Sequence, residues 1–440
     1  MKMNNLSFKG GTHIKDYKDL SAEKATERME DPKIVHIPLD QHIGSVCEPL
    51  VQVNDVVKIG QKIGSSSASL SSDVHSSVSG VVTAIEEMYT TDGSLSKCIT
   101  IETDGLNEVD ESIKPIENFK SLSFEEKCDL IKGAGIIGMG GAGFPLHSKL
   151  QSAVGANIDS VILNGAECEP YLNSDYRVML EKTVNIVEGL QIIKEMLNAE
   201  AGYIAIEDNK PKAIDAFNEI ADNYNNVTVA SLVTKFPQGD STRIVNAVTG
   251  RRIPSGGRTS NVQCTVTNVG TVNALYELVS EGKPVYERIV SVTGQGVKEP
   301  KNLMVKVGTS VKDVIEYCGG FNDNANKVLS GGPMTGNTIF DLDAPITKST
   351  TGIVVLTEDL EDTRLESPCI KCSRCIDVCP QFLMPNIINA AVNKEKYDLA
   401  DEHGANDCIE CGSCSYICPA KRKLTESIAL ARKEIKLRKK

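Results

Sequence analysis

The sequence predicts a multidomain protein that combines an all-β part, an α/β part and a cysteine-rich C-terminal part. Its 440 residues exceed the size of one ordinary domain about threefold. Short apolar runs separated by Gly and Ser clusters fill residues 34–101, which is typical of an all-β unit. Alternating strand and helix patterns follow from residue 119, and two runs of closely spaced cysteines begin at Cys369.

The composition narrows the classes of function. Hydrophobic residues make up 40% of the chain and charged residues 24%, so cores of normal size are expected. A net charge of −12, an aromatic content of 5% and the lack of Trp argue against a nucleic-acid partner. Because no run of about 18 apolar residues occurs and residues 1–10 lack the apolar segment of a secretory signal, we expect a cytosolic chain.

The C-terminal end differs from the rest of the chain in charge. Residues 421–440 contain nine basic and two acidic residues, whereas the remaining residues have a net charge of −19. Such an end suits an anionic lipid surface or an acidic protein, and an ordinary solvated helix end is an equally good interpretation. We expect a basic helix or tail here.

The predicted β unit resembles the barrel-sandwich hybrid fold of biotinyl and lipoyl carriers. The resemblance rests on two half-similar stretches, residues 51–64 and 74–85. A carrier would have a lysine at the tip between these halves, but residues 65–72 contain only Ser, Ala and Leu. We therefore expect an unmodified module over residues 31–105 with a docking or structural role. Three histidines of this module are expected to be ordinary surface or core residues: His36, His42 and His75.

A glycine-rich segment follows a predicted helix over residues 124–132. It contains Gly138-x-Gly140-x-x-Gly143, which matches the dinucleotide-binding fingerprint. In an ordinary Rossmann fold this fingerprint follows a strand, so the preceding helical pattern argues against that fold. Backbone N–H groups of the glycines could still contact phosphate, with Lys149 adding positive charge. A glycine-rich loop without a ligand is the alternative.

Eight of the fourteen cysteines form two runs with the spacing of bacterial two-cluster ferredoxins. The runs are Cys369-x-x-Cys372-x-x-Cys375-x-x-x-Cys379-Pro380 and Cys408-x-x-Cys411-x-x-Cys414-x-x-x-Cys418-Pro419. Two zinc sites are the alternative, but structural zinc uses two separated cysteine pairs and does not need a third cysteine at this spacing. In ferredoxins of this type the fourth cysteine of each run binds the other cluster. This assigns Cys369, Cys372, Cys375 and Cys418 to one 4Fe-4S cluster, and Cys408, Cys411, Cys414 and Cys379 to the second.

Four ordered motifs resemble the flavin subunit of respiratory complex I, which binds FMN and NADH in one cavity. They span residues 138–145, 163–170, 236–242 and 265–271. Two departures are Met139, where that family has Arg, and Ser241, where it has a second Glu. The resemblance implies non-covalent FMN binding by Gly138, Gly140, Lys149, Asn164 and Asn268. It implies a nicotinamide nucleotide beside Phe144, Glu167, Glu169 and Asp240, and Gly141, Gly143 and Thr267 complete the cofactor-binding candidates.

The order of modules is similar to that of RnfC, a component of the Rnf complex, with N-terminal signatures at residues 8–13, 38–44 and 75–80. The resemblance implies a mixed α/β and β multidomain fold that ends in a ferredoxin-like helical domain. The expected parts are an N-terminal arm (1–30), the barrel-sandwich hybrid (31–105), a complex I flavin-subunit-like α/β domain that binds FMN and NADH (119–284), a soluble-ligand-binding β-grasp domain (285–345), the two-cluster ferredoxin domain (360–420) and the basic end (421–440).

The function implied is that of a peripheral subunit on the cytoplasmic side of a cell-membrane complex. It would exchange electrons between NAD(H) and FMN by hydride transfer and pass them through two 4Fe-4S clusters, as part of ion-translocating ferredoxin:NAD+ oxidoreduction. Hydride transfer on FMN requires no catalytic side chain, so none is assigned. The partners implied are the other membrane subunits and an electron-carrier subunit or ferredoxin. The alternatives are a cobalamin reductase of the propanediol-utilisation type and a non-enzymatic electron wire with an empty glycine-rich loop.

Overall fold

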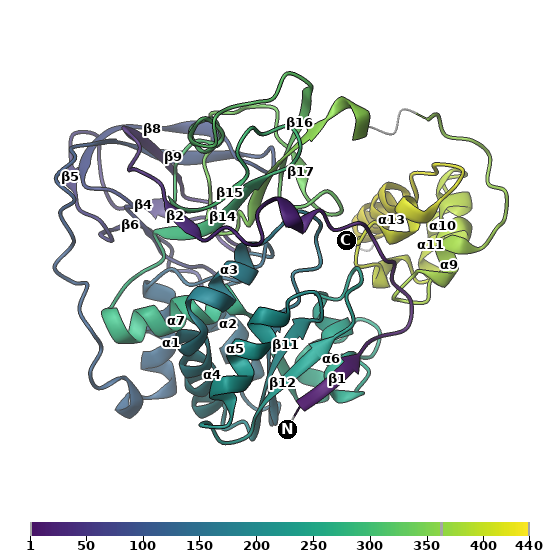
Figure 1. Ribbon diagram of the computed structural model, residues 1–440, viewed down its shortest axis with the longest axis horizontal. Coiled ribbons are helices and arrows are strands. Elements are labelled where there is room, and N and C mark those ends of the chain that lie inside the picture. The colour runs from purple at the N-terminus through teal and green to yellow at the C-terminus, as the bar shows by residue number, and fades with distance from the viewer. Residues whose placement is uncertain (1, 361–363, 439–440) are drawn as a thin grey trace.

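The computed structural model describes residues 2–360 and 364–438 (Figure 1). Residues 1, 361–363 and 439–440, which fall in the predicted arm, ferredoxin domain and basic end, lie outside the described residues. In the described part, no helix is both long and apolar enough to cross a bilayer.

The barrel-sandwich unit consists of two small antiparallel sheets, as the pattern of residues 34–101 predicts. One sheet has the order β3-β9-β8-β5 and the other the order β4-β6-β7. Side chains between the sheets, among them Val35, Ile63 and Ile101, are fully buried. The strands are β3 (Ile34–Pro38), β4 (Glu48–Pro49), β5 (Val56–Val57), β6 (Lys62–Ser65), β7 (Val74–His75), β8 (Gly80–Tyr89) and β9 (Leu95–Thr103).

The α/β unit contains a parallel five-stranded sheet with the order β1-β12-β11-β10-β13. After β10 the chain forms β11 and β12 on one side of β10, and it then crosses over to form β13 on the other side of β10. Ligands of open α/β sheets bind at such a switch point, beyond the carboxyl ends of the strands. The strands are β1 (Lys2–Leu6), β10 (Ser160–Gly165), β11 (Ala201–Glu207), β12 (Val227–Leu232) and β13 (Cys264–Asn268).

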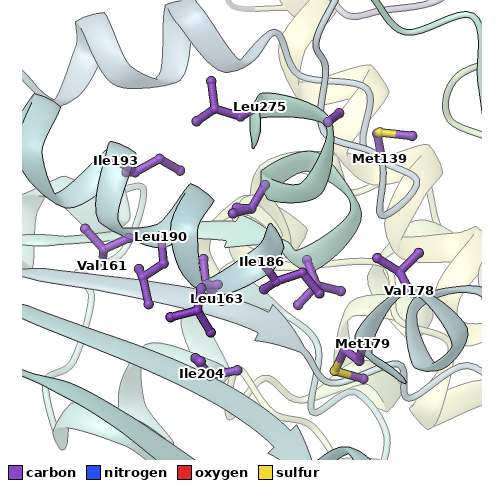
Figure 2. Close-up of a cluster of buried hydrophobic side chains, with 14 of the residues drawn as sticks. Met139, Val161, Leu163, Val178, Met179, Ile186, Leu190, Ile193, Ile204 and Leu275 are labelled. Carbon is purple, nitrogen blue, oxygen red and sulfur yellow. The ribbon is translucent and has the colours of Figure 1, made fainter. Parts of the chain in front are cut away.

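Helices cover this sheet and form its largest apolar core with it. Figure 2 shows Leu190 and Ile193 of one helix close to Val161 of the sheet. One apolar stripe with helical spacing runs through residues 175–200, but it is divided between two helices, because Lys182 (φ −131°, ψ 31°) leaves the helical conformation between them. The helices are α1 (Phe124–Gly133), α2 (Leu146–Ala153), α3 (Ser174–Glu181), α4 (Thr183–Leu197), α5 (Pro211–Ala221), α6 (Ser241–Thr249) and α7 (Val269–Glu281).

A mixed six-stranded sheet with the order β17-β16-β18-β14-β15-β2 forms the third unit. The N-terminal segment contributes an edge strand to each of two sheets, since β1 pairs with β12 and β2 pairs with β15. Residues 2–30 thus tie the α/β unit to the third unit. The elements are β2 (Thr26–Arg28), β14 (Glu287–Thr293), β15 (Lys301–Lys306), α8 (Val311–Tyr317), β16 (Ala325–Ser330), β17 (Asn337–Thr338) and β18 (Gly352–Thr357).

The C-terminal unit is a small group of helices at one end of the molecule (yellow in Figure 1). The longest of them packs Ile428 and Ala431 against Ile388 in a compact core. The basic C-terminal segment is therefore a helix with one buried face up to Arg438. The helices are α9 (Arg374–Asp377), α10 (Pro385–Val392), α11 (Tyr397–Glu402), α12 (Ser413–Ile417) and α13 (Leu424–Arg438).

Candidate functional site: a shared cavity and two groups of cysteines

A cavity of about 690 Å³ lies beyond the carboxyl ends of β10 and β13. Every predicted cofactor-binding residue except Gly143 lines it. The other units also contribute to its wall: Thr91 and Asp92 come from the β8–β9 hairpin of the barrel-sandwich unit, residues 330–332 come from the third unit, and Cys411 comes from the C-terminal unit. The cavity is thus built by all four parts of the chain.

The glycine-rich loop runs between α1 and α2 and forms a tight turn. The Gly138 N–H donates to the Phe144 carbonyl (2.9 Å), and the Gly143 N–H donates to the Gly138 carbonyl (3.1 Å). Gly143 is in the left-handed region with φ of 62°, which favours glycine in this turn. It does not line the cavity. At Gly140 a larger residue would not fit, because its Cβ atom would lie 2.9 Å from Nδ2 of Asn268. The predicted helix before the loop is confirmed as α1.

Two predicted polar residues direct helix N-termini at the cavity. Oδ1 of Asn268 accepts hydrogen bonds from the N–H groups of Gly270 (2.8 Å) and Thr271 (3.3 Å), at the start of α7. Oδ1 of Asp240 does the same for the first turn of α6. The partial positive charge of a helix N-terminus favours anionic groups such as phosphates. Asn164 instead holds the wall together, since its Nδ2 donates to the Gly239 carbonyl (2.8 Å).

The two glutamates predicted beside the nicotinamide nucleotide have structural partners. Glu167 accepts hydrogen bonds from the N–H groups of Asp175 (2.9 Å) and Tyr176 (3.3 Å) and therefore caps α3. Glu169 accepts from the Met334 N–H (3.1 Å) and from the Thr335 hydroxyl, which joins the α/β unit to the third unit. Burial raises the pKa of Glu169 above its ordinary value.

Lys149 and Thr267 give the observations that test whether the cavity fits a bound cofactor. Lys149 lines the cavity and donates to the Val266 carbonyl (2.9 Å), and burial lowers the pKa of its ammonium group to about 8. The Thr267 hydroxyl is buried and has no hydrogen-bond partner among the described residues. A buried hydroxyl without a partner is costly. The cavity therefore offers an ammonium group and an unsatisfied hydroxyl, which fit a polar phosphate-bearing ligand such as FMN.

Sequence reasoning missed several charged residues at this site, among them Asp175 in the cavity wall and Arg288 behind the glycine-rich loop. Asp175 lines the cavity and accepts from Nδ2 of Asn268 (2.7 Å), and burial together with the nearby Glu167 raises its pKa to about 7. Arg288 of β14 donates to the Met139 carbonyl (3.1 Å), so a buried guanidinium supports the loop at the position that departs from the complex I pattern. Asp175 sits in a helical pattern and Arg288 in a strand pattern, so no local spacing marks them.

The eight cysteines of the two runs separate into two groups of four, each around a small cavity. One group is Cys369, Cys372, Cys375 and Cys418, and the other is Cys379, Cys408, Cys411 and Cys414. These are the groups expected when the fourth cysteine of each run crosses to the other cluster. Within the described residues, no three His, Cys, Asp or Glu side chains form a site for a single metal ion.

The two groups, which we name outer and inner, have different surroundings. In the outer group (Cys369, Cys372, Cys375, Cys418), Cys369 and Cys372 are exposed. In the inner group (Cys379, Cys408, Cys411, Cys414), Cys379 and Cys414 are buried. Cys411 lines both the inner group's cavity and the large cavity that holds the glycine-rich loop.

Other residues noted in the sequence lie in packed surroundings. Cys168 accepts a hydrogen bond from the Gly239 N–H (3.3 Å), and burial raises the pKa of its thiol, which disfavours a nucleophilic role. Burial lowers the pKa of His36, His42 and His75. The turn that would carry a lipoyl lysine is covered, because Lys132 of α1 donates to the carbonyls of Ser66 and Ala68 (both 2.9 Å). These contacts agree with a structural role for the barrel-sandwich unit.

Comparison with known proteins gives four matches to family models, in the predicted order. Residues 6–106 match the RnfC barrel sandwich hybrid domain, 131–277 the Nuo51 FMN-binding domain, 289–338 the SLBB domain and 362–419 a 4Fe-4S dicluster domain. The RnfC-type component of the proton-translocating ferredoxin:NAD(+) oxidoreductase complex of Clostridium ljungdahlii is 44% identical over 97% of this chain and 94% of that relative. The chain belongs to the RnfC family. The Na(+)-translocating counterpart of Acetobacterium woodii is 40% identical over 99% of this chain and 98% of its own length.

Two further matches have lower sequence identity. The corresponding component of the ion-translocating oxidoreductase complex of Rhodobacter capsulatus is 35% identical over 89% of this chain and 76% of its own length. A solved structure of an NAD+-reducing NiFe hydrogenase in the H2-reduced state is 14% identical with a TM-score of 0.48, over 73% of this chain and 63% of that chain.

Membership in the RnfC family confirms several predictions. The predicted fold class, the electron-transfer function within an Rnf complex, the oxidoreductase class, and FMN and 4Fe-4S clusters as cofactors are all supported by the matched families. The chain is part of a membrane-associated complex, so other Rnf subunits are its partners. The cobalamin reductase and electron-wire alternatives are set aside by these matches.

Proposed function

We propose that this protein exchanges electrons with NAD(H) in the large cavity and passes them to the inner cysteine group first and the outer group second. The observation that supports this order is Cys411, which lines the cavity of the inner group and the large cavity together. Electron transfer needs close approach of the two redox groups rather than a covalent link. The outer group, with two exposed cysteines, suits exchange with another protein.

FMN, when bound, converts the two-electron chemistry of a hydride into the single electrons that iron–sulfur clusters accept. The chain's residues would bind and orient it. Helices α6 and α7 present their N-termini to the cavity, Lys149 and Thr267 offer polar atoms, and Gly140 lets the loop pass close to Asn268, beside the site proposed for the flavin ring. Side chains on the nucleotide side, Phe144, Glu169 and Asp240, would orient the nicotinamide against that ring.

The proposed metal ligands are the two groups of four cysteines, each of which surrounds one small cavity. The outer cluster would be bound by Cys369, Cys372, Cys375 and Cys418, and the inner cluster by Cys379, Cys408, Cys411 and Cys414. Thiolates from two separated runs around one cavity match the donor set of a cubane cluster. We keep the predicted domain limits as part of the proposal, with β18 added to the β-grasp unit.

The surface around the outer group suits an acidic electron-carrier protein. The side chain of Ile370 is 66% exposed beside the exposed Cys369 and Cys372. Lys371 on the same loop and Arg374 at the start of α9 are also exposed. A small apolar contact flanked by two positive charges steers an acidic partner toward the cluster. We propose that this face is turned toward the other subunits, with the chain bound peripherally on the cytoplasmic side.

The test is an anaerobic absorbance spectrum of the purified, cluster-reconstituted protein before and after NADH, with iron and released flavin quantified. We expect two clusters and one FMN per chain, with bleaching of the flavin band followed by bleaching of the cluster absorbance. Cluster iron without flavin binding and without a response to NADH would overturn the proposed assignment of the cavity.

A further inference from the structure

The C-terminal unit contacts the rest of the molecule through the segment that carries the last cysteine of the first run. The Gly11 N–H of the N-terminal segment donates to the Val378 carbonyl (2.9 Å). A Cβ atom at Gly10 would lie 2.9 Å from the Cys379 carbonyl oxygen, so the two backbones touch. The inner cysteine group thus lies directly at this contact.

Arg243 places a positive charge within the same contact. From α6 it donates to the Pro380 carbonyl, which follows Cys379, and to Oε1 of Gln381 (3.3 Å). Nε of Arg243 lies 3.8 Å from Oδ1 of Asp240, which lines the large cavity. The guanidinium therefore spans from the cavity wall to the cysteine-bearing segment.

The burial of Arg243 makes a purely packing role a poor explanation. Its side chain is only 12% exposed, and burial lowers the pKa of the guanidinium. Placing a charge in such a position costs desolvation free energy that an apolar side chain would avoid. The planar fork of arginine can donate to two acceptors on one segment at once, whereas a lysine cannot hold both in fixed geometry.

We propose that Arg243 is a positioning residue for electron transfer between the flavin cavity and the inner cluster. It fixes the segment of residues 379–381 against α6, and its charge stabilises the more negative, reduced form of the cluster, which raises the cluster's reduction potential. One electron leaves the reduced flavin and one enters the oxidised cluster, and Arg243 neither gains nor loses a proton. The inference rests on the proposed function.

The experiment compares Arg243→Gln and Arg243→Lys with Arg252→Gln as a control. Arg252 is an exposed arginine just beyond α6, and it has the same charge. In Arg243→Gln we expect unchanged iron, FMN and NADH-driven flavin reduction, but cluster reduction slower by about tenfold, as for a lost charge-assisted hydrogen bond. The midpoint potential of the inner cluster shifts to a more negative value, while the outer cluster's potential stays unchanged. Arg243→Lys restores the potential but not the rate, and the control changes neither.

Hydrogen–deuterium exchange gives a readout that does not depend on turnover. Residues 376–383 should exchange faster in both Arg243 variants than in the wild type and the control. Wild-type rate, potential and exchange in Arg243→Gln would overturn the proposal, and full restoration of the rate by lysine would overturn the positioning role. If Arg243→Gln fails to assemble clusters, Gln381→Ala, which removes one acceptor, tests the same contact through rate and exchange.

The outcome for Arg243 can be separated from that for the proposed function. If NADH fails to reduce the wild-type clusters, the proposed function is wrong. The two midpoint potentials, measured by chemical titration with EPR detection, still decide whether Arg243 acts on the inner cluster.

Discussion

The inner and outer cysteine groups each take three cysteines from runs of identical spacing, yet they occupy different positions in the molecule. Inner Cys411 shares the wall of the large cavity with Asn268 and Gly140, whereas outer Cys369 and Cys372 face solvent. The surroundings of a motif, rather than its spacing, thus decide what it can do. The inner group borders the large cavity, the proposed partner surface lies at the outer group, and four sets of variants test this contrast.

The largest effect is expected from removing one cluster at a time. Cys411→Ala should abolish the inner cluster, so NADH still bleaches the flavin but the outer cluster stays oxidised. Cys372→Ala should abolish the outer cluster and leave the inner one reducible by NADH. EPR spectra after NADH addition, with iron counted for each variant, measure both results. Reduction of the outer cluster by NADH in Cys411→Ala would reverse the proposed order.

A second variant affects the cavity and leaves both cysteine groups intact. In Gly140→Ala the new methyl group meets Asn268, with 2.9 Å to Nδ2 and 3.2 Å to Cγ. Because hydrogen bonds to Asp175, Gly270 and Thr271 hold the Asn268 side chain in place, we expect FMN affinity to fall by about tenfold or more, as overpacking predicts. Equilibrium titration of flavin fluorescence measures it. The control is Gly133→Ala, where the nearest atom lies 3.9 Å away, and equal affinities in the two variants would contradict the steric explanation.

A third, smaller effect is confined to the outer side. Reversing the charge at Lys371 and Arg374 to Glu should slow reduction of an acidic one-electron carrier protein by about tenfold at low salt, and less at high salt. NADH-driven reduction of the protein's own clusters should not change. Lys433→Glu on the exposed part of α13 is the matched control. Stopped-flow measurement of the carrier's reduction rate at two salt concentrations tests this prediction. Equal slowing by the control would contradict the proposal that the carrier binds at this surface.

Local spacing in the sequence was enough to predict much of the site. The two cysteine runs predict both groups, and the four motifs contain about half of the residues that line the cavity, because these residues lie on short loops whose geometry is set locally. Thr91, Asp92 and Arg288 were not predictable in this way. They reach the site only because separate units pack together, and such contacts leave no periodic signal in one sequence.

Local reasoning also missed contacts that some of the predicted residues make. Glu167 lies at the site as expected, but it accepts the N–H groups that begin α3. Helix caps are normally sought next to the helix in sequence, and Glu167 is seven residues away from Ser174, the first residue of α3. The break at Lys182 was hidden because the apolar stripe continues on both sides of it.

The smallest effect is expected from replacing Asp175, and it concerns the stability of the protein near the large cavity alone. Burial and Glu167 raise its pKa from 3.8 to about 7, with Asn268, Arg288 and Lys210 opposing the shift. The folded protein therefore binds a proton that the unfolded chain releases. This contribution to stability is complete below about pH 4 and is lost as the pH rises through about 7. Asp175→Asn mimics the protonated form and should remove this dependence.

Denaturant midpoints of the flavin-free protein at pH 6 and pH 8 test the Asp175 prediction. The variant should gain stability relative to the wild type as the pH rises, by about 1 kcal/mol, since one pKa unit corresponds to about 1.4 kcal/mol. Asp129→Asn on an exposed position of α1 serves as the control. A difference between wild type and Asp175→Asn that does not change with pH would mean that the carboxyl is ionised throughout. Arg288 would then outweigh burial at this end of the cavity, and the inner side would hold a fixed negative charge next to the flavin.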